Sequence, residues 1–286
     1  MLEACAKYLF ELDGGKKIRP TMVLLVARAA AAHAPRSGSG VNGHHASEPE
    51  LEYPGPLPSQ KRLAEITEMI HTASLFHDDV IDEADARRGV PSINKLYGNK
   101  MAILAGDFLL ARASVSLARL RNVEVVELLS TVIEHLVKGE VMQSRPQALL
   151  DGSGAADDGR AALEYYLHKN YYKTGSLMAN SCRAAVLLAG HGDSLQAQAF
   201  AYGRHVGLAF QLVDDVLDFE QSSETLGKPA LNDLRQGLAT APVLLAAQRF
   251  PREVAELVKR KFRSEGDVER VRRAGGGGWV VCFSLF

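Results

Sequence analysis

The chain has 286 residues, of which 47% are hydrophobic, and it carries 33 Lys and Arg residues against 34 Asp and Glu residues. This composition excludes a disordered chain, a collagen and a disulfide-stabilised mini-protein. The balance of charge excludes a chain-wide basic surface for nucleic acid, so any anionic ligand must be bound at a local site. Cys5, Cys182 and Cys282 form no C-x-x-C pair, which predicts a reducing compartment and no disulfide.

The N-terminal part, Leu2 to Ala32, consists of strong helix formers with a break at Asp13-Gly14-Gly15. The almost continuously apolar stretch from Thr21 to Ala32 predicts a buried helix. The first ten residues have neither the basic start of a signal peptide nor the Arg-rich character of a transit peptide, so we expect no targeting segment in this chain. His33 to Gln60 is rich in Pro, Gly, Ser and His without an apolar period, which predicts a disordered insertion.

Apolar residues then recur at helical spacing over several stretches, whereas strand-like alternation is nearly absent. The predicted helices cover Lys61–Asp82, Lys100–Arg119, Glu124–Gln143, Leu163–Ala189 and Leu195–Phe219. A polar break at Asp151–Gly159 predicts a surface loop. The pattern predicts an all-α protein, with residues 1–286 forming one helical bundle around one core. Apolar runs are interrupted well short of the ~20 residues that cross a bilayer, so we expect a soluble or peripheral protein.

The C-terminal end differs from the rest of the chain. A charged stretch from Arg252 to Arg273 predicts a helix, and it is followed by four consecutive glycines and the apolar sequence W-V-V-C-F-S-L-F. Residues 274–286 therefore form an atypical tail, without helix caps or charges.

An acidic pattern, D-D-x-x-D, occurs twice, each time at the end of an apolar helix. Its members are Asp78, Asp79 and Asp82, and Asp214, Asp215 and Asp218. Positions i and i+4 share a helix face, so the outer two carboxylates of each motif project together. One such motif alone is typical of a solvated helix end. Two copies on separate apolar helices favour compensation by hard divalent cations such as Mg²⁺, which prefer oxygen ligands.

Basic residues lie beside glycines at four places, where the backbone can approach an anion closely. These are Lys16-Lys17-Ile18-Arg19 after Gly14-Gly15, Arg87-Arg88-Gly89, Lys173-Thr174-Gly175 and Gly227-Lys228-Pro229. Each cluster alone could be an ordinary solvated surface. Interleaved with the acidic motifs, they indicate paired phosphate-binding sites.

The series G-G-K-K-I-R-P, H-T-A-S-L-F-H-D-D-V-I-D, R-R-G, G-E-V-M-Q, K-T-G, Q-L-V-D-D-V-L-D-F and G-K-P resembles the trans-isoprenyl (polyprenyl) diphosphate synthases. The resemblance runs from about Tyr8 to Ala247. It is closest to the long-chain members that make the hexaprenyl, solanesyl or decaprenyl side chain of ubiquinone. The implied fold is the isoprenoid synthase bundle, with the two acidic motifs facing each other across a central cavity.

By resemblance, the protein is an enzyme that adds isopentenyl diphosphate to an allylic diphosphate, with Mg²⁺ as cofactor. The implied metal ligands are Asp78, Asp82 and Asp214, and the other three aspartates would complete the motifs directly or through water. The diphosphate of isopentenyl diphosphate would be held by Lys16, Arg19, His71 and Arg88. The allylic diphosphate would be held by Arg87, Lys173 and Lys228, while oxygens of Thr174 and Gln211 face the allylic cation. Taken alone, His71, Thr174 and Gln211 would each be read as an ordinary hydrogen-bonded helix residue, as His77 is.

Chain length is expected to depend on Ala73 and Ser74, which lie one turn before Asp78. Family members with short products carry bulky aromatic residues there, so these small residues predict a long product. Tight helix packing is the alternative reason for small residues at this place.

The resemblance also implies a homodimer or heteromer, a mitochondrial location or otherwise a cytoplasmic one, and peripheral membrane contact for product release. Relatives are expected to extend beyond this chain at both ends. Three alternatives remain: a non-catalytic or inactive truncated subunit of a heteromeric synthase, a terpene cyclase, and an unfolded product of a gene model. The intact second motif and G-G-K-K-I-R-P both disfavour a cyclase.

Overall fold

The computed structural model describes residues 17–33, 55–87, 89–144, 156–220 and 240–260, together with residues 262, 264, 266, 267 and 270. Apart from two strands of two residues each, the regular elements in these ranges are helices, which confirms the all-α fold class. The chain divides into two compact units. The expected single domain over residues 1–286 stays a prediction, and each unit is described by itself.

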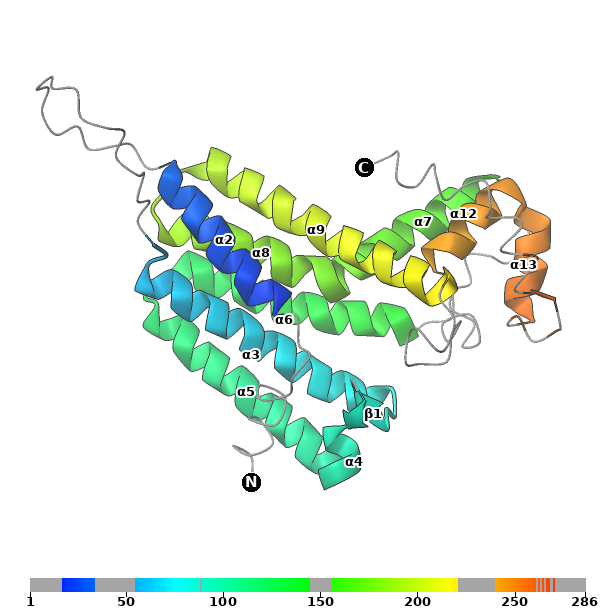
Figure 1. Ribbon diagram of the computed structural model, residues 1–286, viewed down its shortest axis with the longest axis horizontal. Helices are drawn as coiled ribbons and strands as arrows, with labels where there is room; N and C mark the ends of the chain where they lie inside the picture. Colours follow the sequence, from blue (N-terminus) through cyan, green and yellow to red (C-terminus); the bar gives the residue numbers. More distant parts are fainter. Residues whose placement is uncertain are drawn as a thin grey trace, which may run out of the picture. The chain divides into compact units, whose positions relative to one another are not determined.

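The first unit comprises Met1–Glu134 and Ser176–His205. It contains α2 (Ile18–Ala32), α3 (Pro58–Ile81), α4 (Ile93–Tyr97), α5 (Asn99–Arg119), α8 (Ser176–Leu188), and the first parts of α6 (Val123–Ser144) and α9 (Asp193–Glu220). α3 packs against α2, α5 and α8, and α2 also contacts α8 (Figure 1). α3 is thus the central helix of this unit, and it carries the first acidic motif at its C-terminal end.

α3 begins at Pro58 rather than at the predicted Lys61. Proline is favoured at the first position of a helix because the backbone N–H that it lacks would have no intrahelical partner there. The side chain of Gln60 accepts a hydrogen bond from the Leu57 N–H (2.8 Å) and donates one to the carbonyl of Ala185 on α8 (2.8 Å). The last residues of the predicted insertion 33–60 are therefore helical, and residues 34–54 lie outside the described residues.

Between α3 and α5 the chain forms an antiparallel pair of strands, β1 (Ala86–Arg87) and β2 (Val90–Pro91), followed by α4. These elements are too short to give a periodic signal, which is why the sequence did not predict them. The end of α3 is packed through a buried apolar cluster: Ala73, Phe76, Ile93, Ala102, Ala105 and Leu109. This cluster joins α3, α4 and α5 and fixes the helix end from which the first motif projects.

α5 is the one described helix that is long and apolar enough to cross a membrane by length and composition. A soluble core helix can pass the same test, and α5 packs along α3. On the surface of the helix, Ile103, Leu104 and Val115 remain exposed. α5 therefore presents an apolar face that other described elements of its unit do not cover.

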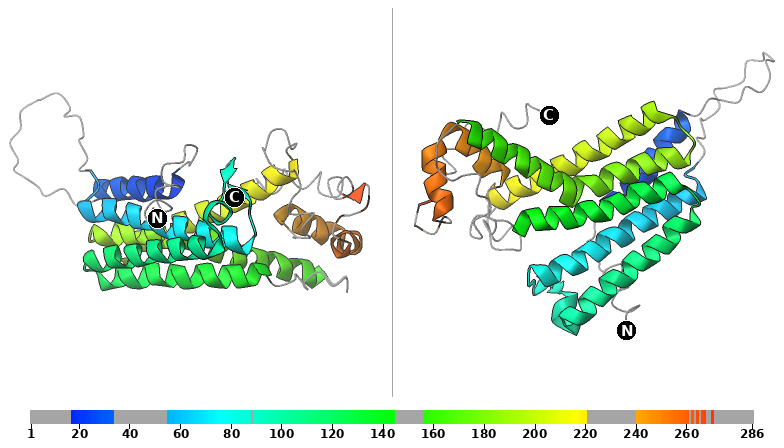
Figure 2. Two further views of the ribbon diagram at one scale, coloured as in Figure 1. Left: turned by 90° about the horizontal axis from the view of Figure 1, so that it is seen from below. Right: turned by 180° about the vertical axis from the view of Figure 1, so that it is seen from behind.

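The second unit comprises His135–Gly175 and Val206–Phe286. It contains the remainders of α6 and α9, α7 (Ala156–Asn170), the π-helical turn η2 (Tyr171–Gly175), α12 (Ala241–Arg249) and α13 (Pro251–Lys259). α12 packs against α13, which follows it in the chain, and against α7, which lies far from it in the sequence (Figure 2). The buried core of the second unit includes Tyr166, Leu244, Val254 and Leu257. The predicted helix Arg252–Arg273 is described only in part, and the tail 274–286 lies outside the described residues.

The predicted helix Leu163–Ala189 is interrupted. α7 begins already at Ala156, so the last residues of the predicted loop Asp151–Gly159 are helical, and η2 separates α7 from α8. Such π-turns are often found at functional sites, and apolar periodicity does not reveal them. η2 lies close to α6, because a Cβ on Gly139 would come within 2.9 Å of the backbone nitrogen of Lys173.

Candidate active site

The first acidic motif ends α3. Asp82 follows the last helical residue, and its backbone N–H donates to the carbonyl of Asp78 (2.8 Å), so the two residues lie one turn apart. The Asp78 side chain is half-buried and that of Asp82 is exposed. Carboxylates at the C-terminal end of a helix meet the negative end of its dipole as well as each other. A cation bound between the two carboxylates would interact favourably with both.

Asp79, the middle residue of the first motif, points elsewhere. It is only 2% exposed, and both of its oxygens accept hydrogen bonds from Arg87 on β1, from Nε at 3.0 Å and from a terminal nitrogen at 2.6 Å. Asn94 ties the same turn together by donating to the backbone carbonyls of Asp79 (3.2 Å) and Ala84 (3.0 Å). Arg87, predicted to bind substrate, thus also holds the hairpin to α3. Arg88 lies outside the described residues.

On the same face of α3, about two turns before Asp78, His71 contacts α2. A terminal guanidinium nitrogen of Arg19 lies 2.9 Å from His71 Nε2. Arginine can only donate, so Nε2 accepts and the imidazole proton sits on Nδ1. The spacing His71, Ser74, Asp78 and Asp82 follows one helix face. The structure therefore brings Arg19 and His71 to the side of α3 that carries the outer carboxylates, while Lys16 lies outside the described residues.

The two residues predicted to set chain length have different surroundings. Ala73 is fully buried in the apolar cluster between α3, α4 and α5. Ser74 is half-buried on the face of Asp78, and its hydroxyl donates to the carbonyl of His71 (2.8 Å). The burial of Ala73 is what the packing alternative expects, and its role in chain length stays a prediction. His77 lies 3.3 Å from the carbonyl of Ile103 on α5, which agrees with its structural interpretation.

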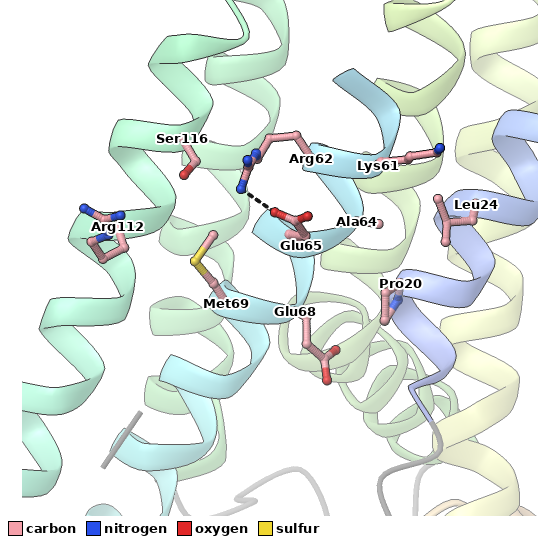
Figure 3. A pocket seen from close by; sticks show the side chains of 10 residues that line it. All are labelled: Pro20, Leu24, Lys61, Arg62, Ala64, Glu65, Glu68, Met69, Arg112 and Ser116. Carbon is pink, nitrogen blue, oxygen red and sulfur yellow. Dashed lines mark hydrogen bonds and ion pairs between the residues drawn. The ribbon is translucent and has the colours of Figure 1, made fainter. Parts of the chain in front are cut away.

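A groove of about 570 Å³ opens on the first unit between α2, α3 and α5 (Figure 3). Its wall includes Pro20 from α2, Arg112 from α5 and an ion pair between Arg62 and Glu65 on α3. The lining residue of α3 nearest to the motif, Met69, precedes Asp78 by more than two helical turns. The groove is therefore separate from the acidic motif.

The second motif lies near the C-terminal end of α9. Asp214 is exposed and Asp218 is half-buried, one turn apart on the same side of the helix. Asp215 is only 5% exposed. Its Oδ2 accepts hydrogen bonds from the Tyr166 hydroxyl (2.6 Å) and the Ala241 N–H (3.1 Å), and its Oδ1 accepts one from Gln211 Nε2 (3.1 Å). The middle carboxylate of this motif too is bound by the protein itself.

The π-turn η2 places two predicted site residues in the second unit. Lys173 Nζ donates to Glu140 Oε2 and to Gln143 Oε1 on α6, each at 2.8 Å. The Thr174 hydroxyl donates to Gln211 Oε1 at 3.3 Å. The sequence did not single out Tyr166, whose position at helical spacing looks like any core residue. Gln143 stood in the G-E-V-M-Q motif without a role, and Lys228 lies outside the described residues.

In the part of the chain that the structure describes, no three His, Cys, Asp or Glu side chains converge as a metal cage. Pairs of outward carboxylates are what remains, and this donor set fits Mg²⁺, which takes one or two carboxylates and completes its shell with water and phosphate oxygens.

Comparison with known proteins gives one consistent result. A family model described as "Polyprenyl synthetase" matches residues 1–274. The chain is 46% identical to the probable mitochondrial hexaprenyl pyrophosphate synthase of Yarrowia lipolytica, covering 95% of this chain and 68% of the relative. It is 48% identical to the mitochondrial solanesyl-diphosphate synthase 1 of Oryza sativa subsp. japonica, covering 94% of this chain but 59% of the relative. The chain thus spans only part of the length of these relatives.

A solved structure agrees. The crystal structure of polyprenyl synthase from Caulobacter crescentus CB15, complexed with calcium and isoprenyl diphosphate, is 31% identical, with a TM-score of 0.70 over 96% of this chain and 75% of that chain. The predicted fold family is therefore confirmed.

Proposed function

The chain belongs to the polyprenyl synthetase family, and on that premise we propose that it is a Mg²⁺-dependent trans-prenyltransferase. It condenses isopentenyl diphosphate with an allylic diphosphate and makes a long polyprenyl diphosphate for the side chain of ubiquinone. The observation that carries this proposal is the pair of outward carboxylates in each motif, Asp78 with Asp82 and Asp214 with Asp218, which lie one turn apart on one helix face.

In this proposal Asp78, Asp82 and Asp214 bind Mg²⁺, with Asp218 contributing directly or through water. The metal ions supply charge neutralisation for the leaving diphosphate. Lys173, Arg87 and Lys228 hold the allylic diphosphate. The position of Lys173 between Glu140 and Gln143 supports this role, because both partners restrict where its ammonium group can lie.

Isopentenyl diphosphate is held by Arg19 and His71, together with Lys16 and Arg88. The bond between the allylic carbon and its diphosphate oxygen breaks, and the electron pair leaves with the diphosphate. The isopentenyl double bond then attacks the allylic carbon, and the resulting cation loses a proton to the released diphosphate, which leaves the trans double bond. Thr174 and Gln211 stabilise the positive charge of the allylic carbon by presenting oxygen atoms.

A long product is supported by the small side chain of Ser74 on the face of Asp78 and by the long-chain names of the relatives. Both relatives are named as mitochondrial, which supports a mitochondrial location for this chain. The exposed apolar face of α5 supports pairing with a second copy or a related subunit, as a homodimer or heteromer. The alternative of a non-catalytic subunit is disfavoured by the intact outward carboxylates of both motifs.

The test is to incubate the purified chain with farnesyl diphosphate, radiolabelled isopentenyl diphosphate and Mg²⁺, and to measure product length by chromatography. We expect long labelled polyprenyl diphosphates that disappear with chelator and return with added Mg²⁺. Folded chain that incorporates no label, while a longer relative does so under the same conditions, would contradict the proposal and favour the non-catalytic alternative.

A further inference from the structure

Both oxygens of Asp215 are hydrogen-bonded to groups of the protein. Tyr166 on α7 and the first N–H of α12, from Ala241, bind Oδ2 at 2.6 and 3.1 Å, while Gln211 binds Oδ1 at 3.1 Å. The side chain is 5% exposed, whereas its neighbour Asp214 is exposed. A carboxylate that binds a metal ion must direct a lone pair at the ion. These contacts direct the oxygens of Asp215 at the core of its own unit.

The charge of Asp215 fixes the direction of the hydrogen bonds beyond it. An ionised carboxylate can only accept, so Gln211 must present its Nε2 to Asp215 and its Oε1 to the opposite side. Oε1 in turn accepts the proton of the Thr174 hydroxyl, at 3.3 Å. Because that hydroxyl has one proton and two lone pairs, donation to Gln211 leaves its lone pairs for a positive partner. These hydrogen bonds, from Thr174 to Gln211 and from Gln211 to Asp215, form a relay in which the direction of donation is fixed by Asp215.

The anchor of this relay is rigid. Tyr166 belongs to the buried core that joins α7 and α12, and Lys169 lies over its ring at 5.6 Å. Thr240, which precedes α12, makes no side-chain cap, so the Asp215 carboxylate supplies the acceptor that the first N–H of α12 requires. An anion at a helix N-terminus is also favourable with respect to the helix dipole.

We propose that Asp215 is a positioning residue and not a metal ligand: it orients the amide of Gln211 and, through it, the hydroxyl of Thr174, so that oxygen lone pairs face the allylic carbon. Tyr166 holds Asp215 in place and is a second positioning residue. This inference rests on the proposed function, and it separates Asp215 from Asp214, which the same motif places beside it.

The first test compares Asp215→Asn with Asp214→Asn as a matched control. We measure the increase in melting temperature on addition of Mg²⁺ with a thio analogue of farnesyl diphosphate that does not react. The expected result is a wild-type increase in Asp215→Asn and a lost increase in Asp214→Asn. Loss of the increase in both variants would overturn the inference but leave the proposed function intact. No increase in the wild type would overturn the proposed function, and the inference with it.

Kinetics supply the second readout. Asp215→Asn should lower kcat roughly 10- to 100-fold, the size expected for a charge-assisted hydrogen bond, with the KM of both diphosphates within about twofold of wild type. Tyr166→Phe, which removes one hydroxyl and is the gentler change, should lower kcat about 3- to 10-fold with the same pattern. Raised KM with unchanged kcat in Tyr166→Phe would overturn the inference even where Asp215→Asn folds poorly.

A charge-swapped pair gives the sharpest test. In Gln211→Glu alone, the new carboxylate lies against that of Asp215, and neither can donate a hydrogen bond to the other. In the double variant Asp215→Asn with Gln211→Glu, the amide donates to the new carboxylate, which can again accept the Thr174 proton. We expect the double variant to exceed the poorer single variant in kcat at least about tenfold. Losses that multiply in the double variant would show that the relay has no required polarity and would overturn the inference.

Discussion

The two acidic motifs have the same sequence pattern, and in both the middle carboxylate is buried while the outer two lie together on one helix face. They differ in what holds that middle residue. Asp79 is paired with the charged Arg87 of a two-residue strand, whereas Asp215 is held by neutral donors from Tyr166, Gln211 and a backbone N–H. The difference shows that two copies of one motif can bury the same residue and leave the other two together on one helix face, while different partners bind the buried carboxylate.

The means of support has a consequence for function. Arg87 is 27% exposed and is also proposed to bind the allylic diphosphate, so its contact with Asp79 can be exchanged for a substrate contact. Tyr166 and Ala241, which bind Oδ2 of Asp215, lie in a packed core and have no proposed substrate contact. We therefore expect the contact between Arg87 and Asp79 to change when substrate binds, and the contacts of Asp215 to stay the same.

The largest effect should come from the outer carboxylates, where the comparison predicts equality. Asp78→Asn and Asp214→Asn should each lower kcat at least roughly 10²- to 10³-fold. Both variants should keep a cooperative thermal melt, because Asp78 is half-buried and Asp214 is exposed. The measurement is turnover together with thermal melting in chelator. Retained turnover in one of the two variants would break the equivalence of the motifs.

The next effect concerns the two anchors and uses salt to separate them. Arg87→Ala leaves the Asp79 carboxylate buried without its partner and should cost about 1–3 kcal/mol of unfolding free energy, discounted for the partial exposure of Arg87. Because this contact is partly solvent-screened, the cost should shrink in high salt. Tyr166→Phe should cost about 1–2 kcal/mol of unfolding free energy, and this cost should not depend on salt. Denaturant unfolding at low and high salt measures both. Equal salt dependence would remove the distinction between the anchors.

The residues before the first motif test which face of α3 the product follows. Ser74→Phe should shorten the product with little change in melting temperature, because Ser74 lies half-buried on the face of Asp78. Ala73→Phe should lower the melting temperature as well, since a large side chain in the packed cluster costs about 1–3 kcal/mol. Chromatography of products and thermal melting separate the two. Unchanged product length in Ser74→Phe would show that Ser74 does not limit the length of the product.

The smallest effect is expected at His71, which has no counterpart in the second motif. His71→Phe should raise the KM of isopentenyl diphosphate about tenfold, because Arg19 loses the acceptor that orients it. The KM of the allylic diphosphate should stay within about twofold. Steady-state kinetics with each substrate varied in turn gives both values, and a rise confined to the allylic substrate would contradict the assignment of Arg19 and His71.

Much of the architecture could be predicted from the sequence, because helix periodicity is a local property. The stretches that became α5, α6 and α9 were predicted within a residue or two at most ends. The start of α3 was missed because Pro58 signals a break as well as a helix start, and η2 was missed because its i+5 spacing leaves no apolar period. In the described residues, Cys182 has a free thiol, and burial raises the pKa of that thiol to about 12.

The sequence could predict which motifs form the candidate site, but not what each residue of a motif does. The spacing of D-D-x-x-D shows that its outer residues share a face, but nothing in it says that the middle carboxylate turns inward. That depends on partners far along the chain, such as Tyr166, which lies 49 positions before Asp215. Such partners belong to tertiary packing, which one sequence does not display.

The most direct test of this account counts metal ions. Mn²⁺, which replaces Mg²⁺ at oxygen sites, can be titrated into the protein with the unreactive thio analogue of farnesyl diphosphate and quantified by electron paramagnetic resonance. We expect Asp78→Asn and Asp214→Asn to lose bound Mn²⁺, whereas Asp79→Asn and Asp215→Asn should bind as many ions as the wild type. Loss of an ion on substitution of either middle aspartate would contradict it.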